Sequence, residues 1–182
     1  MTAMIDEPRR INPVLRLGIW ASDKAVGKRL LQARLLAWVP RAAVGAGAME
    51  ALVVHRDRTI SERILKLVRI AVSLAANCAF CIDMNSHEFD LAGITDDELD
   101  ALRRDGLAPT FTPRERIAIR FARLLTATPL AVDDATRAEL TSLFDDREIV
   151  VLATTAAQVN FWARLTHGLG IPPAGFSEAC AL

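Results

Sequence analysis

Residues 59–88 read TISERILKLVRIAVSLAANCAFCIDMNSHE. Apolar residues recur at steps of three and four through its first half, and Thr59-Ile-Ser-Glu62 fits a capping box, so the pattern predicts an amphipathic helix to about Ala76. Asn77 can cap a second helix, which we expect over residues 78–91. Two helices joined by so short a connection favour antiparallel packing.

Helix signals recur along the rest of the chain. Thr95-Asp-Asp-Glu98 is a capping box, and Thr112-Pro-Arg-Glu115 adds a proline at the first helical position. Further helices are expected over about residues 22–39, 41–55, 133–144 and 146–167. No segment sustains the alternation of apolar and polar residues that is typical of a strand. The sequence therefore predicts an all-α fold.

The composition limits the function classes. The chain has 182 residues, 52% of them hydrophobic and 24% charged, which is enough apolar material for one packed core. Its 22 basic residues balance 22 acidic ones, which argues against nucleic-acid and anionic-membrane partners because these bind basic surfaces. No apolar stretch reaches the roughly 18 uninterrupted residues of a membrane span. Zero net charge and a mean hydropathy of +0.24 favour a homo-oligomer.

The cysteines carry the main chemical signal. Three cysteines are too few for a disulfide scaffold, and the first ten residues lack the apolar core of a signal peptide, so a reducing cytoplasm is expected. Cys78 and Cys81 lie three residues apart behind a predicted helix cap, where free backbone amides stabilise a thiolate. This spacing favours redox chemistry over simple packing. Zinc is the alternative, although the remaining candidates form no recognisable second ligand pair: His55, His87, His167 and Cys180.

Residues 66–87, KLVRIAVSLAANCAFCIDMNSH, resemble the core of the carboxymuconolactone decarboxylase superfamily, specifically its alkyl hydroperoxidase D-like branch. Residues 112–122 and 146–165 are similar to the carboxyl-terminal half of many members. The resemblance implies an alkyl hydroperoxidase D-like helical bundle in a single domain. The expected parts are an amino-terminal extension with one helix, the helical domain and a carboxyl-terminal tail, at residues 1–39, 40–175 and 176–182.

The resemblance also implies a mechanism. Cys81 attacks a hydroperoxide as the peroxidatic thiol, and Cys78 resolves the resulting sulfenic acid to a disulfide. In the family, a glutamate twelve residues before the first cysteine and a histidine four residues after the second relay protons. Lys66 and Asn85 occupy those positions here, so the chain departs from the relay pattern.

Helical geometry ranks the polar residues around the pair. At about 100° per residue, Asn85 and Glu88 face the sulfurs and His87 faces away. Asn85 can hydrogen-bond a thiolate but cannot exchange a proton at neutral pH. We expect Glu88 to be a solvated charge rather than a site carboxylate, and Glu62 to be a capping residue paired with Lys66. Lys66 would instead lower the pKa of the thiols if it approached them.

The sequence thus predicts a CxxC thiol-dependent hydroperoxidase or disulfide reductase that requires no bound cofactor. The family resemblance implies a dithiol reductant of lipoyl or thioredoxin type, and assembly into a trimer or a larger ring such as a hexamer. Two alternatives stay open: a lactone decarboxylase, and a non-catalytic oligomer whose cysteine pair senses oxidation. The decarboxylase branch does not depend on a CxxC, so the pair argues against it.

Overall fold

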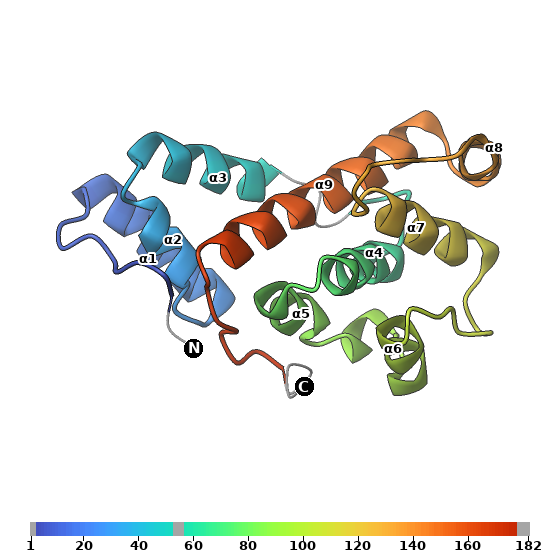
Figure 1. Cartoon of the computed structure of the whole chain (residues 1–182), viewed down its shortest axis with the longest axis horizontal. Helices are drawn as coiled ribbons and strands as arrows, with labels where there is room; N and C mark the ends of the chain where they lie inside the picture. Colours follow the sequence, from blue (N-terminus) through green and yellow to red (C-terminus); the bar gives the residue numbers. More distant parts are fainter. Residues whose placement is uncertain (1–2, 53–56, 178–182) are drawn as a thin grey trace.

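The computed structural model describes residues 3–52 and 57–177, and every regular element within these ranges is helical (Figure 1). The all-α prediction is therefore confirmed. In the described part of the chain, no helix has the length and apolar character needed to cross a membrane. The helices in chain order are α1 (Pro13–Val26), α2 (Leu31–Leu36), α3 (Pro40–Leu52), α4 (Glu62–Ala75), α5 (Ala79–Ser86), the short 3₁₀ helix η1 (Asp90–Ala92), α6 (Asp96–Arg103), α7 (Pro113–Leu124), α8 (Asp134–Leu143) and α9 (Asp146–Gly168).

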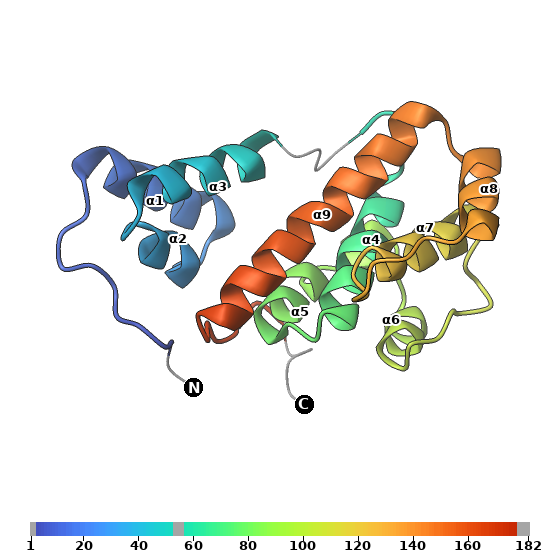
Figure 2. The same ribbon diagram turned by 45° about the horizontal axis from the view of Figure 1, so that its top comes forward.

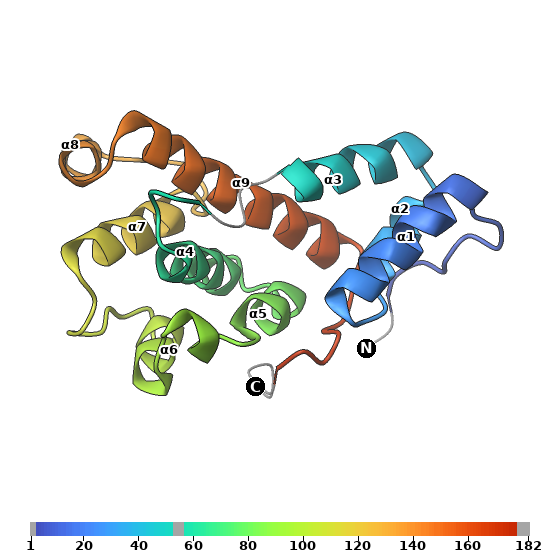
Figure 3. The same ribbon diagram turned by 180° about the vertical axis from the view of Figure 1, so that it is seen from behind.

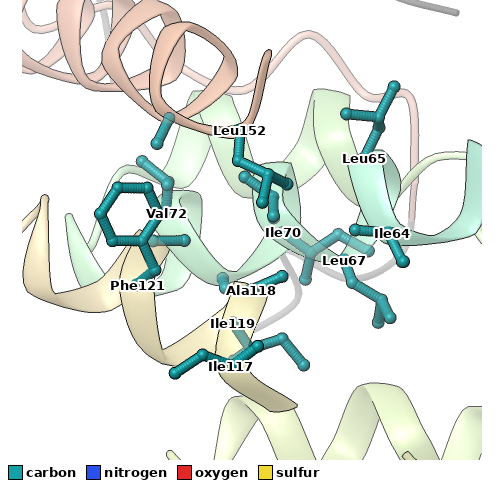
Figure 4. Packing of buried hydrophobic residues seen from close by; sticks show 14 of the residues in the cluster. Ile64, Leu65, Leu67, Ile70, Val72, Ile117, Ala118, Ile119, Phe121 and Leu152 are labelled. Carbon is teal, nitrogen blue, oxygen red and sulfur yellow. The ribbon is translucent and has the colours of Figure 1, made fainter. Parts of the chain in front are cut away.

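The helix α4 lies at the centre of the molecule, packed against α5, α7 and α9 (Figures 1 and 3). Its apolar side chains pack against residues of α7 and α9, as Figure 4 shows. Fully buried side chains occupy most of its circumference: Leu65, Leu67, Ile70, Ala71 and Val72. Burying one such leucine or isoleucine stabilises the fold by about 1.5–3 kcal/mol. This core, more than helix propensity, fixes α4 in place.

Capping boxes begin α6, α7 and α9, and those at Thr95 and Thr112 are as predicted. The glutamates of the first two boxes, Glu98 and Glu115, are buried. Arg63 of α4 lies between them and donates to Glu98 at 2.7 Å and to Glu115 at 2.6 Å. One guanidinium group therefore joins the central helix to the beginnings of α6 and α7.

The capping box predicted at Thr59 is wrong. The cap of α4 is Ser61, whose hydroxyl oxygen accepts a hydrogen bond from the backbone amide of Ile64, with an N–O distance of 3.2 Å. Glu62 is the first residue of the helix. Thr59 instead donates its hydroxyl to the carboxylate of Asp57 at 2.6 Å. The Thr59 hydroxyl, which the sequence pattern assigned to the cap of α4, is therefore hydrogen-bonded to Asp57 instead.

The amino-terminal segment also differs from its prediction. It contains two helices, α1 and α2, where one was expected over about residues 22–39. Gly27 ends α1 with a φ of +74°, a conformation that glycine adopts readily. Pro40 then begins α3 (Pro40–Leu52), and His55, the last residue of the helix predicted there, lies outside the described residues. In Figure 2, α1–α3 lie beside the carboxyl-terminal end of α9.

Candidate functional site

Cys78 and Cys81 lie at the start of α5, directly after α4. Asn77 has a φ of +47°, which turns the chain between the two helices, and the amide of Cys78 donates to the carbonyl of Ser73 at 3.2 Å. The cap of α5 is Cys78 rather than the predicted Asn77, because the Sγ of Cys78 accepts the amide of Cys81 at 3.2 Å. A sulfur that caps a helix sits where the helix dipole favours negative charge.

Both cysteines are free thiols, and each is 2% exposed. They belong to an apolar cluster drawn from α2, α5, α9 and the segment after α9. We call it the dithiol cluster; its buried members are Leu35, Cys78, Phe80, Cys81, Ala163 and Ile171. Trp162 and Leu31 are partly buried and pack against it. The pair therefore lies in a buried apolar environment to which segments distant in sequence contribute.

Thr166 of α9 is a polar neighbour that sequence reasoning missed. Its Oγ1 lies 3.2 Å from the Sγ of Cys78 and 3.9 Å from the Sγ of Cys81. The same hydroxyl lies 2.8 Å from the carbonyl oxygen of Trp162, to which it can donate. Because a hydroxyl has one proton, it can give that proton to the sulfur when Cys78 is a thiolate. No local spacing signals this contact, which arises from the packing of α9 on α5.

These contacts separate the pKa values of the two thiols. The pKa of Cys78 is lowered to about 6: the hydrogen bond from the Cys81 thiol outweighs burial, and Thr166, the Cys81 amide and the charge of His167 add to the effect. The pKa of Cys81 is raised, because its thiol donates to Cys78 and because it is buried. The reduced pair therefore holds one thiolate, on Cys78. These pKa shifts favour a thiolate on Cys78, whereas the family resemblance implied Cys81 as the attacking thiol.

The low pKa of Cys78 gives a testable pH dependence. In a Cys180→Ser background, thiolate absorbance in the ultraviolet should appear as the pH rises through about 6. Below that pH the sulfur is protonated and the absorbance is lost. Adding Cys81→Ala removes the side-chain donor to Cys78, which is the largest cause of the shift, so the midpoint should move upward. A midpoint near the ordinary thiol pKa of about 8.5 in the Cys180→Ser protein would contradict the assignment.

Lys66 and Asn85, the residues at the family's relay positions, make structural contacts instead. The ammonium group of Lys66 donates to the carbonyl of His87 just after α5, and burial, with the charge of Arg69, lowers the Lys66 pKa. The positive charge that acts on Cys78 comes from His167. The amide of Asn85 donates to the hydroxyl of Ser73 at 3.0 Å, which ties α5 to α4.

The remaining predicted residues lie away from the sulfurs. α5 ends at Ser86, so the helical geometry does not extend to Glu88, which has a φ of +52°. The expectation that Glu88 faces the pair is wrong; its side chain is 59% exposed, which matches the expected solvated charge, and lies 3.5 Å from His87. The ring of His87 lies against that of Phe176. Glu62 is exposed at the opposite end of α4.

Asp83 is a second residue that sequence reasoning missed. Its carboxylate is fully buried and accepts the amides of Ala174, Gly175 and Ser177, each at 2.8 Å. It thereby holds the segment that follows α9 against the dithiol cluster, to which Ile171 contributes. A signal was available, because a carboxylate two residues after Cys81 in a largely apolar helix must find partners if buried.

Among the described residues, no three or more His, Cys, Asp or Glu side chains form a group that could hold a metal ion. The zinc alternative therefore finds no ligand set in that part of the chain.

Residues 40–124 match the model of the carboxymuconolactone decarboxylase family. The matched stretch runs from the start of α3 to the end of α7 and includes both Cys78 and Cys81. The uncharacterized protein YnjA of Escherichia coli (strain K12) is 30% identical over 109 residues, which cover 60% of each chain. The uncharacterized protein YdfG of Bacillus subtilis (strain 168) is 26% identical over 116 residues, which are 63% of this chain and 79% of the relative. The chain thus aligns with less than two thirds of the length of YnjA.

Solved structures share the fold. A variant of the debrominase Bmp8 in complex with 2,3,4-tribromopyrrole has a TM-score of 0.79 at 17% identity, covering 99% of this chain and 96% of that one. The alkylhydroperoxidase AhpD core of a peroxidase-related protein from Ralstonia eutropha JMP134 has a TM-score of 0.78 at 18% identity. The match covers 94% of this chain and 92% of that one. At these identities the likeness concerns the fold, and it confirms the predicted alkyl hydroperoxidase D-like architecture of this chain.

Proposed function

We propose that this protein is a thiol-dependent oxidoreductase that reduces a hydroperoxide through Cys78 and Cys81. The observation that carries the proposal is the pair of buried sulfurs beside the Thr166 hydroxyl, one favoured as a thiolate and the other as its hydrogen-bond donor. The fold shared with peroxidase-related proteins supports it. An external dithiol of lipoyl or thioredoxin type would reduce the disulfide and complete the cycle.

The proposed reaction needs no relay residue. The Cys78 thiolate attacks the terminal oxygen of the hydroperoxide, the O–O bond breaks, and the alkoxide leaves as an alcohol after taking the proton of the Cys81 thiol. Cys78 is then a sulfenic acid, and the Cys81 thiolate attacks its sulfur. A disulfide forms, and the departing hydroxide takes a proton from solvent to become water. Because Cys81 supplies the first proton, Lys66 and Asn85 transfer none.

A single-turnover experiment tests the proposal. The reduced protein is mixed with less than one equivalent of cumene hydroperoxide, and free thiols are counted. We expect one Cys78–Cys81 disulfide per hydroperoxide, which dihydrolipoamide then reduces. A disulfide that forms but is not reduced by any dithiol would indicate the sensor alternative. Unchanged thiols would contradict the proposal.

Reductive dehalogenation is a second candidate, favoured by the fold likeness to a debrominase over nearly the whole chain. The Cys78 thiolate would attack the bromine of a bromoarene, and the released carbanion would take a proton. Cys81 would then displace bromide from Cys78 to give the disulfide. Bromide release from 2,3,4-tribromopyrrole by the reduced protein separates this candidate from hydroperoxide reduction.

We also propose that the protein is a homo-oligomer that buries α3. This helix has Arg41 and Glu50 as its only charged residues, yet Ala46 is its one buried residue. Val44 is 61% exposed and Leu52 is 82% exposed. A helix that is apolar on most sides is normally covered, and a second copy of the chain would cover this one.

Replacing both Val44 and Leu52 by aspartate should therefore dissociate the oligomer, because the charges would be buried without partners. Light scattering should show a mass that falls toward the 19.9 kDa of a single chain. Ser142→Asp on α8 is the control, and it should leave the mass unchanged. A mass near 20 kDa for the unaltered protein would contradict the proposal.

A further inference from the structure

Gln32 of α2 is a buried polar residue with an unmet hydrogen bond. Only 5% of its surface is exposed, and its side-chain oxygen Oε1 has no hydrogen-bond partner in the described part of the chain. Buried polar atoms nearly always have a partner in folded proteins, because an unpaired one loses its bonds to water without replacement. This oxygen can only accept, so its missing partner is an O–H or N–H donor.

The position of Gln32 connects it to the thiols. Leu35, three residues further along α2, is a buried member of the dithiol cluster, and Leu31 packs against the same cluster. At about 100° per residue, Gln32 lies roughly 60° around the helix from Leu35 and 100° from Leu31, at the edge of the face that packs against the cluster. Figure 2 shows α2 beside the end of α9 that carries Thr166.

The other buried atom without a partner is the hydroxyl of Thr155. Thr155 lies eleven residues before Thr166, which is about 16 Å along α9. Among the described residues, the two unmet bonds therefore belong to different places: Gln32 lies three residues from Leu35, a buried member of the dithiol cluster, whereas Thr155 lies eight residues from Ala163.

We propose that Gln32 binds the substrate by accepting a hydrogen bond from the terminal O–H of the hydroperoxide. The organic group packs against the apolar side chains of the dithiol cluster, and the bond to Oε1 fixes the direction of the terminal oxygen that Cys78 attacks. This inference rests on the proposed function. It gives the amino-terminal segment a part in substrate recognition, since α2 lies outside the segment that matches the family.

A pair of unreactive ligands tests the contact. Cumyl alcohol carries an O–H on the organic group of cumene hydroperoxide, and isopropylbenzene lacks it. Gln32→Leu keeps the approximate size of the side chain and removes the acceptor. By calorimetric titration of the reduced protein, we expect the variant to bind cumyl alcohol about tenfold more weakly and isopropylbenzene within about twofold of the unaltered protein.

Gln158→Leu is the matched control. It removes the same chemical group from α9, where the side-chain amide donates to the carboxylate of Glu50. This variant should lose thermal stability, because it leaves Glu50 with one donor fewer, and it should keep the ratio of the two ligand affinities. Gln32→Leu should be as stable as the unaltered protein or more so, since it removes an unpaired atom.

Turnover separates this inference from the proposed function. Oxidation of the cysteine pair by cumene hydroperoxide should slow about tenfold in Gln32→Leu, whereas oxidation by 4,4′-dithiodipyridine, which has no O–H or N–H, should not change. If the unaltered protein does not reduce hydroperoxides but Gln32→Leu still weakens cumyl alcohol selectively, the proposed function fails and the Gln32 site stands. The inference is overturned if Gln32→Leu binds cumyl alcohol as the unaltered protein does, which is expected if Oε1 holds only a buried water. It is also overturned if the variant binds both ligands more weakly by the same factor.

Discussion

Cys78→Ser should slow the oxidation of the protein by cumene hydroperoxide by on the order of 10³-fold or more. The reason is the charge on the nucleophile. The Cys78 sulfur is a thiolate at neutral pH, with a pKa of about 6, whereas a serine hydroxyl at the same position is not ionised. Stopped-flow measurement of hydroperoxide consumption under single-turnover conditions gives the rate.

Cys180→Ser is the control for that variant, because this third thiol lies outside the cysteine pair. It should keep the rate of the unaltered protein. If Cys78→Ser also keeps that rate, Cys78 is not the nucleophile, and the sulfur order implied by the family resemblance is the correct one.

Arg63→Ala should lower the free energy of unfolding by about 3–5 kcal/mol, the usual cost of removing one partner from a buried ion pair. The guanidinium of Arg63 bonds two carboxylates, and the variant leaves both Glu98 and Glu115 buried without their cation. Urea denaturation measures the loss. Arg103→Ala is the control, because Arg103 forms an exposed pair with Asp100 and should change the stability by less than about 1 kcal/mol.

The same cluster gives a pH dependence of known sign. Burial raises the pKa of Glu98, but hydrogen bonds from Arg63, Thr110 and the Thr95 amide outweigh it and lower the pKa to about 2. A carboxylate with a depressed pKa stabilises the fold above its unfolded pKa and loses this contribution as the pH falls. Stability should therefore decrease between about pH 4.5 and pH 2, and the decrease should be smaller in Glu98→Gln.

The sequence predicted a helix start correctly where the hydrogen bonds between residues close in sequence are the ones that form in the structure. The capping boxes at Thr95 and Thr112 are examples, because hydroxyl and glutamate lie three residues apart and need no other contact. The end of α5 at Ser86 was missed because a distant group acts there: Lys66 of α4 binds the carbonyl of His87. A helical wheel cannot detect such a contact.

The sequence predicted only those parts of the candidate site that depend on residues close together in the chain. The CxxC pair is local, so the sequence located it, and the family resemblance indicated the fold around it. Thr166 reaches the site only through the packing of α9 on α5, at a separation that no motif encodes. The lowered pKa of Cys78 depends first on the hydrogen bond from the Cys81 thiol and then on Thr166, and the contact with Thr166 is one that no local spacing shows.

Trapping of the sulfenic acid tests the central claim, that Cys78 is the attacking thiolate and Cys81 its partner. The Cys81→Ser protein is treated with one equivalent of cumene hydroperoxide in the presence of dimedone, a reagent that labels sulfenic acids. The peptide that contains residues 78–81 is then sequenced by mass spectrometry. Without Cys81 no disulfide can form, so the sulfenic acid persists long enough to be labelled. We expect the label on Cys78, and none on Cys81 when Cys78→Ser is treated in the same way. A label on Cys81 in Cys78→Ser, with Cys78 unlabelled in Cys81→Ser, would contradict the account.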